Sequence, residues 1–180
     1  LGTRIWDKNN AITGVDYYLN DPRREELVPI SKLAARDAVV REATVENIEI
    51  YKHTAMLPRA RIVPKLETAP TTDALFARML ESTFDPASTA ITESAASAAP
   101  PVTQIASVGT ATILDHTPQR VTIEYEASAD AVLVLADSFY PGWQATIDGM
   151  TSTIFPVYHC YRGVVVPPGR HTVDFRYRPT

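Results

Sequence analysis

The sequence has almost no cysteine and no long apolar run. Cys160 is the only cysteine among 180 residues, so no disulfide can form within the chain, and a disulfide-stapled secreted scaffold is excluded. The longest purely apolar run covers residues 131–136, far short of the roughly 20 residues that a membrane-spanning helix needs. The first residue is Leu1 rather than Met, and no secretory signal follows it. We therefore expect a piece of a longer polypeptide, with any membrane attachment outside this stretch.

A dominant charge of one sign is also absent. The net charge is −4, from 17 Lys and Arg against 21 Asp and Glu. Domains that bind nucleic acid usually carry a basic face, and polybasic membrane anchors need a cluster of Lys or Arg. The sequence shows neither, so we expect no nucleic-acid partner. Its composition, 45% hydrophobic and 21% charged, is typical of a globular domain.

Motifs for catalysis and for metal or cofactor binding are missing. The sequence has no Gly-rich phosphate loop, no Gly-x-Ser-x-Gly elbow and no Walker pattern. His159 and Cys160 are adjacent and would point to opposite faces of a strand, and the other histidines, His53, His116 and His171, are scattered without ligand spacing. We expect no metal, no cofactor and no catalytic residue in this chain.

A stretch of small residues and prolines divides the chain. Residues 94–101, Ser-Ala-Ala-Ser-Ala-Ala-Pro-Pro, cannot contribute a core face, and two consecutive prolines interrupt both helices and strand ladders. We predict that they connect a mixed α/β segment, residues 1–93, with an antiparallel β-sandwich, residues 102–180, on which the first segment packs. The predicted fold class is α+β, mostly β.

The first segment combines short strands with one helix. Residues 71–82 predict the helix, because Thr71 or Thr72 can cap its N-terminus and apolar residues recur at helical spacing. The apolar stripe, which should face the core, consists of Leu75, Met79 and Leu80. Extended pieces are predicted at residues 2–6, 15–19, 45–51 and 58–63.

The second segment has the alternation of antiparallel strands. Residues 120–127 place Val121, Ile123 and Tyr125 on one face, whereas residues 132–135 are apolar on both faces and predict a central, doubly covered strand. Asp148-Gly149 is a strong tight-turn signal. Further strands are predicted at residues 104–114, 143–147, 153–157, 164–166 and 171–177.

Three separated motifs in this segment follow one another in a familiar order. They are Leu-Val-Leu-Ala-Asp-Ser-Phe-Tyr-Pro-Gly-Trp-Gln-Ala-Thr-Ile-Asp-Gly at 133–149, Arg-Gly-Val at 162–164 with Val-Pro-Pro-Gly-Arg-His-Thr-Val at 166–173, and Phe-Arg-Tyr-Arg-Pro at 175–179. Upstream, Ile-Tyr-Lys at 50–52 and Leu-Pro-Arg-Ala at 57–60 fit the same pattern, although the linker between them is longer than expected. From about residue 48 to residue 179 the chain resembles the C-terminal extracytoplasmic region of the YfhO family of bacterial polytopic membrane proteins.

The resemblance implies a parent with many membrane helices, similar to glycosyltransferases that use lipid-linked sugars to modify cell-envelope glycans. It implies a non-catalytic accessory domain on the extracytoplasmic side of the bacterial cytoplasmic membrane, because the family's catalytic acid lies between early helices that this chain lacks. The implied partners are the transmembrane helices of the parent chain and a cell-envelope glycan or lipid-linked sugar. Two alternatives remain: a carbohydrate-binding β-sandwich module and a soluble glycoside hydrolase-like enzyme.

The residues around a Tyr-Pro-Gly-Trp turn are the candidates for ligand binding. Tyr140 and Trp143 would stack on a sugar, with Tyr161 extending the aromatic strip; in the structural alternative, Trp143 plugs the end of the core. Asp137 and Arg162 complete the candidate set. Asp137 follows an apolar strand, and its alternative role is to accept backbone hydrogen bonds in the turn.

Charged residues on the strand faces leave two further questions open. Four arginines would give the last hairpin a positive face for phospholipid or pyrophosphate groups, unless they pair across strands with Asp174 and Glu124: Arg162, Arg170, Arg176 and Arg178. A hydrolase would need two carboxylates about 5 to 9 Å apart, and its candidates are Asp137, Asp148, Asp174 and Glu124.

Overall fold

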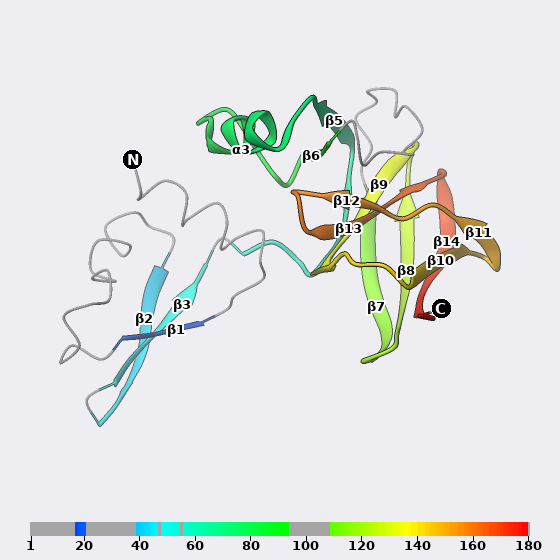
Figure 1. Cartoon of the computed structure of the whole chain (residues 1–180). Coiled ribbons are helices and arrows are strands. Elements are labelled where there is room, and N and C mark those ends of the chain that lie inside the picture. The colour runs from blue at the N-terminus through cyan, green and yellow to red at the C-terminus, as the bar shows by residue number, and fades with distance from the viewer. Residues whose placement is uncertain (1–16, 21–38, 47, 55, 94–108, 180) are drawn as a thin grey trace. The chain divides into compact units, whose positions relative to one another are not determined.

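The computed structural model describes residues 17–20, 39–46, 48–54, 56–93 and 109–179, and it divides the chain into two compact units (Figure 1). Unit 1 covers Leu1–Pro58 and unit 2 covers Arg59–Thr180. Within the described residues one helix accompanies several antiparallel sheets, which confirms the predicted α+β, mostly β class. The connector predicted at residues 94–101 lies outside the described residues. Along the chain, the boundary between the two units falls between Pro58 and Arg59.

Unit 1 contains a three-stranded antiparallel sheet. β3 (Ile48–His53) pairs with β1 (Tyr17–Asn20) on one side and with β2 (Val39–Val45) on the other. The prediction of a single strand over residues 45–51 is wrong, because the chain reverses there: Glu46 has a φ of 56°, and Val45 pairs with Ile48. The strand predicted at 15–19 overlaps β1 in part, and the one predicted at 2–6 lies outside the described residues.

Unit 2 contains a five-stranded antiparallel sheet in the order β11-β10-β14-β8-β7. Its strands are β7 (Gly109–Thr117), β8 (Arg120–Ala127), β10 (Trp143–Ile147), β11 (Met150–Ser152) and β14 (Gly169–Tyr177). The alternation predicted for β8 is confirmed, because Val121, Ile123 and Tyr125 are all buried. β11 was not predicted, since its three residues are too few to show a pattern.

A four-stranded antiparallel sheet has the order β12-β13-β9-β4. Its strands are β4 (Ala60–Val63), β9 (Ala131–Ser138), β12 (Phe155–Val157) and β13 (Tyr161–Val166). Residues 131–135 of β9 are buried between β13 and β4, which confirms the prediction of a central strand. β4 comes from the predicted first segment, yet it is a strand of this sheet because Ala60 pairs with Leu135.

Both sheets of unit 2 contribute side chains to one hydrophobic core. Ile123 and Phe175 from the five-stranded sheet and Leu133 and Val164 from the four-stranded sheet belong to the same cluster, and all four are fully buried. Each such side chain stabilises the folded state by about 1.5–3 kcal/mol relative to exposure. That the two sheets form a β-sandwich in the strict sense stays a prediction.

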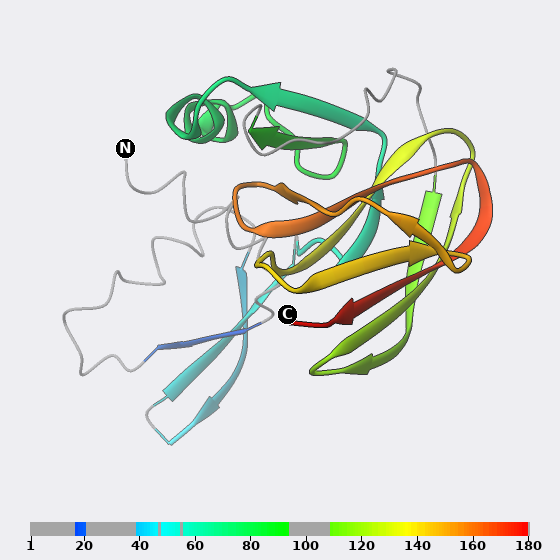
Figure 2. The ribbon, with the colours of Figure 1, turned by 45° about the vertical axis from the view of Figure 1, so that its right-hand side comes forward.

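A helix and two parallel strands complete the described part of unit 2. The chain runs from β5 (Lys65–Ala69) through α3 (Thr72–Leu80) to β6 (Thr89–Glu93), and the helix lies beside both strands (Figure 2). Thr71 caps the helix as predicted, since its hydroxyl oxygen accepts a hydrogen bond from the Ala74 amide. Leu75 and Met79 are buried, but Leu80 is 42% exposed, so its assignment to the buried stripe is wrong. Leu80 lies one position beyond Met79, which turns it about 100° away from that face.

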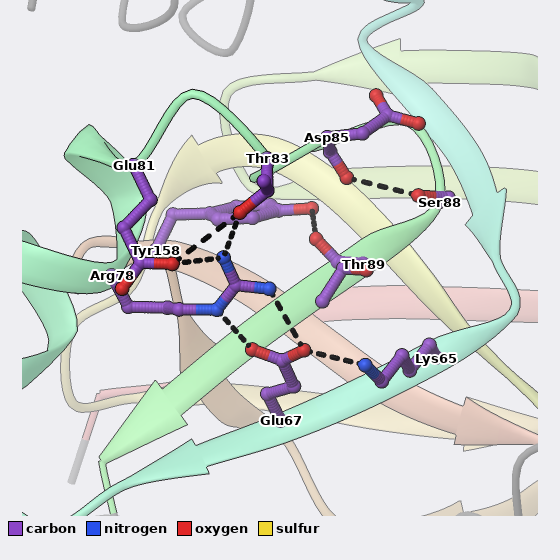
Figure 3. Close-up of polar contacts among 9 residues, drawn as sticks. All are labelled: Lys65, Glu67, Arg78, Glu81, Thr83, Asp85, Ser88, Thr89 and Tyr158. Atoms are coloured by element: carbon purple, nitrogen blue, oxygen red, sulfur yellow. Dashed lines mark hydrogen bonds and ion pairs between the residues drawn. The ribbon is translucent and has the colours of Figure 1, made fainter.

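Arg78 ties the helix to β5 (Figure 3). Its guanidinium donates to both carboxylate oxygens of Glu67, at N–O distances of 2.8 and 3.2 Å, and Lys65 Nζ lies 2.6 Å from Glu67 Oε1. The hydrogen bonds from Arg78, and then those from Lys65, hold the pKa of Glu67 below its ordinary value. Close by, the Tyr158 hydroxyl donates to the carbonyl oxygen of Thr89 at 2.9 Å. These groups satisfy one another, so we interpret the cluster as structural.

The predicted tight turn between β10 and β11 is confirmed. Asp148 and Gly149 have φ values of 49° and 86°, as a two-residue hairpin turn with both central residues left-handed requires. The Asp148 carboxylate accepts a hydrogen bond from the Thr172 amide at 2.8 Å, and its other oxygen lies 2.6 Å from His171 Nδ1. The turn is thereby fastened to β14, the neighbouring strand.

We expect the His171–Asp148 contact to make stability depend on pH. The bond to Asp148 raises the pKa of His171, so its contribution is complete below the unfolded value of about 6.5 and is lost as pH rises through the folded value. The Thr172 amide and then His171 lower the pKa of Asp148, so its contribution is lost only as pH falls below about 3.9. Urea unfolding of the wild type and of His171→Gln should therefore differ most between these two limits. A difference that stays constant from about pH 5 to 9 would contradict this assignment.

Candidate functional site

An aromatic groove opens beside β10 in unit 2. Its volume is about 430 Å³, and we define it by three aromatic residues, Phe139, Tyr140 and Trp143, and by four polar residues that also line it, Gln144, Thr146, Thr151 and Ser152. Phe139 and Tyr140 are 37% and 42% exposed, so two rings are open to solvent at the groove. The groove thus combines apolar ring surface with amide and hydroxyl groups.

Backbone contacts at both ends fix the loop that carries these rings. The Phe139 amide donates to the carbonyl oxygen of Cys160 at 2.7 Å, and the carbonyl oxygen of Gly142 accepts from the Arg178 amide at 2.7 Å. Gly142 has a φ of 100°, and a Cβ at this position would lie 2.7 Å from the ring of Tyr177. Only glycine meets both conditions, which explains the Pro-Gly step between the two aromatic residues.

Three aromatic rings form a cluster at the groove. The ring centroids of Tyr140 and Tyr177 lie 5.3 Å apart, those of Trp143 and Tyr177 5.5 Å, and those of Tyr140 and Trp143 6.2 Å. Tyr140 meets both neighbours edge to face, a favourable geometry for aromatic pairs. Trp143 is half-buried: it packs against the core, as the structural interpretation expects, and it also lines the groove, as the ligand-binding interpretation expects.

Arg162 supports Trp143 from the core side. Its guanidinium carbon lies 3.5 Å from the centroid of the indole ring, and only 4% of its side chain is exposed. Burial lowers the pKa of Arg162, and the charge of Asp137 opposes that shift. Arg162 Nε donates to the carbonyl oxygen of Ser138, whereas Nη1 and the Trp143 indole nitrogen are buried without a hydrogen-bond partner in the described structure. Arg162 therefore contacts the indole of Trp143 but does not itself line the groove.

The carboxylate of Asp137 is paired with Arg59, the residue directly before β4. Both of its carboxylate oxygens accept hydrogen bonds from Arg59, at 2.8 and 2.9 Å, and Arg162 Nη2 lies 3.9 Å from Oδ2. The hydrogen bonds that Arg59 donates to Asp137 raise the pKa of Arg59. The same guanidinium lies 2.9 Å from His116 Nε2. At the end of β9, the carboxylate of Asp137 is thus within ion-pair distance of two guanidinium groups.

The structure brings four of the five predicted site residues close together. Tyr140 and Trp143 line the aromatic groove, Arg162 stacks on Trp143, and Asp137 contacts Arg162. Tyr161 is half-buried outside the groove lining, and burial together with Cys160 raises its pKa to about 12. Sequence reasoning missed the polar residues of the groove, although Gln144 and Thr146 occupy the outward positions of a predicted alternating strand.

Two of the carboxyl groups that the sequence offered for a hydrolase, Asp148 and Asp174, have a lowered pKa. A glycosidase acid needs a raised pKa, yet the described carboxyl groups with a resolved shift all have lowered ones: Glu67, Glu93, Asp148 and Asp174. Over the same described residues, no three His, Cys, Asp or Glu side chains gather as metal ligands would, and no helix has the length and hydropathy to cross a bilayer.

Comparison with known proteins does not identify a function for this site. No protein family, no curated protein and no solved structure matches the chain. The resemblance to the YfhO family therefore stays a prediction, and the geometry of the aromatic groove is the observation on which a function has to be built.

Proposed function

We propose that this chain is a non-catalytic domain that binds a saccharide of the bacterial cell envelope in its aromatic groove. In the setting that its motifs imply, it is an extracytoplasmic accessory domain of a membrane protein similar to lipid-linked-sugar glycosyltransferases. The observation that carries the proposal is the groove itself, where two exposed aromatic rings stand beside polar residues of the paired strands β10 and β11.

The groove offers what a sugar ring requires. One face of a pyranose exposes mainly C–H groups, which pack on the flat surface of Tyr140 or Phe139, while its hydroxyls accept and donate hydrogen bonds at the rim. Gln144 can do both through its amide, and Thr151 and Ser152 can do both through their hydroxyls. A volume of about 430 Å³ lies within the range of roughly 300–1,000 Å³ that small-molecule sites occupy.

The loop is also rigid enough to bind without a large ordering cost. Tyr140 is held between the fixed backbone at Phe139 and the fixed backbone at Gly142, and its ring packs on two neighbours. A side chain that is already ordered loses little further conformational entropy when a ligand arrives. This arrangement favours binding over a purely structural role for the exposed ring.

A glycan array followed by titration calorimetry tests the proposal. We expect the chain to bind at least one class of cell-envelope saccharide, and Tyr140→Ala to weaken that binding about tenfold or more, as the loss of a central aromatic contact does. Phe76→Ala is the matched control, because Phe76 is 43% exposed against 42% for Tyr140 but lies on α3, away from the groove lining.

Two results would overturn the proposal. One is a folded wild-type chain that binds no saccharide on the array. The other is an unchanged affinity in Tyr140→Ala together with an unchanged melting temperature, since the ring would then contribute nothing to the complex.

A further inference from the structure

A second hollow adjoins the aromatic groove on the outer face of the five-stranded sheet. Its volume is about 220 Å³, and Gln144 and Thr146 line both it and the groove. We call it the arginine hollow, because its other lining side chains are Asp174, Arg176 and Arg178. The register places Gln144 opposite Arg176 and Thr146 opposite Asp174, so the two sets of side chains stand in adjacent rows. A ligand bound over Gln144 and Thr146 would therefore reach both hollows.

The arginine hollow carries an excess of positive charge. Asp174 accepts two hydrogen bonds from Arg120, at 2.8 and 3.2 Å, and a third from Arg176 at 2.6 Å. One carboxylate therefore serves two guanidinium groups. Arg178 lines the same hollow, is exposed, and has no carboxylate partner within the described part of the chain. This positive site contrasts with the net charge of −4 of the whole chain.

The prediction that four arginines share a last hairpin is wrong, because Arg162 lies on β13 and Arg170 and Arg176 lie on β14, and these two strands belong to different sheets. Arg162 is buried under Trp143, Arg170 is paired with Glu124 at 2.7 Å, and Arg176 is paired with Asp174. Cross-strand pairing thus accounts for Arg170, which is one of the two interpretations that the sequence left open, whereas Arg176 pairs with Asp174 two residues earlier on the same strand. Within the described residues no partner takes up the five guanidinium N–H donors of Arg178, whose fork matches a carboxylate or a phosphate.

We propose that the arginine hollow binds a carboxylate or phosphate group of the saccharide that occupies the aromatic groove, so that the ligand is an anionic saccharide. This inference rests on the proposed function, because the groove supplies the sugar-stacking half of the site. Because Gln144 and Thr146 line both hollows, one ligand that lies over these two residues can occupy both at once. Arg178 contributes the unpaired charge, and Arg176 contributes the second guanidinium.

The experiment compares matched neutral, uronic-acid and phosphorylated oligosaccharides of equal length, titrated into the wild type, Arg178→Gln and Arg170→Gln. We expect the anionic probes to bind more tightly than the neutral ones. Arg178→Gln should weaken the anionic probes about fivefold to tenfold and leave the neutral ones unchanged, since a charge-assisted hydrogen bond is lost. Arg170→Gln is the control, because Arg170 lies on the same strand but is paired outside the hollow. Raising salt from about 50 to 500 mM should weaken only the anionic probes.

The outcomes separate the two proposals. Equal affinity for neutral and anionic probes, unchanged in Arg178→Gln, overturns the anionic ligand and leaves saccharide binding in place. No saccharide binding at all overturns the proposed function. Binding of the chain to vesicles of anionic phospholipid that depends on Arg178, without saccharide binding, assigns the hollow to a membrane surface and overturns this inference. A preference between the uronic-acid and the phosphorylated probes identifies which anionic group the hollow takes.

Discussion

Asp137→Ala is expected to destabilise unit 2 by about 3 kcal/mol, because it leaves the Arg162 guanidinium buried without a counter-charge. Only 4% of the Arg162 side chain is exposed, and Asp137 is the carboxylate that contacts it within the described residues. The corresponding fall in melting temperature is about 6–12 °C for a chain of this size. Thermal unfolding followed by circular dichroism measures it.

A double-mutant cycle isolates the cause. In the background of Arg162→Met, which fills similar space without a charge, Asp137→Ala should cost at most about 1 kcal/mol, since it then breaks only the more exposed pair with Arg59. Glu124→Ala is the control for an exposed pair and should change stability by less than about 1 kcal/mol. If Asp137→Ala costs the same in both backgrounds, Arg162 does not depend on Asp137 and the assignment fails.

Leu133→Ala is expected to lower the free energy of unfolding by about 2–5 kcal/mol. Leu133 is fully buried in the middle of β9, within the core to which both sheets of unit 2 contribute, and its truncation leaves a cavity that the neighbouring strands cannot fill. Urea unfolding with a fitted m-value measures the change and shows whether the compactness of the unfolded state has altered.

Leu114→Ala is the matched control for this prediction. It makes the same substitution, also in a β-strand, but Leu114 is 57% exposed and lies where the register of β7 shifts against β8. We expect a change within about 0.5 kcal/mol. Similar losses for the two leucines would show that burial in this core does not set the stability of the sheets.

The parts of the fold that follow a local rule were predictable from the sequence. β8 and β10 follow the predicted ranges because an alternating pattern reports directly on a half-buried strand, and Asp148-Gly149 encodes its own turn. The hairpin after β2 was missed because Val45 and Ile48 look like members of one alternating strand, although they pair with each other across a turn. The parallel pair of β5 and β6 was missed because neither short strand alternates and their pairing joins distant segments.

In the candidate site, too, only the features with a local sequence signal were predictable. Tyr140 and Trp143 stand out because aromatic residues flank a Pro-Gly step, which is a local signal. The burial of Arg162 could not be anticipated, since a charged residue in a strand is expected at the surface, and its partners come from two other strands, β9 and β10. The arginine hollow likewise depends on which strand lies next to β10, and that neighbour, β14, is far along the chain.

The pairing of β4 with β9 has a consequence for how the protein folds. The four-stranded sheet is complete only when Ala60 pairs with Leu135, which closes a long loop of chain. Until that loop has closed, the edge of β9 that pairs with β4 in the folded protein stays unpaired, and its residues 131–135 are all apolar. Until then, that edge is a template on which a second chain can add a strand. Folding of unit 2 should accordingly be slow and sensitive to protein concentration, and a fragment that begins after β4 should associate where the whole chain does not.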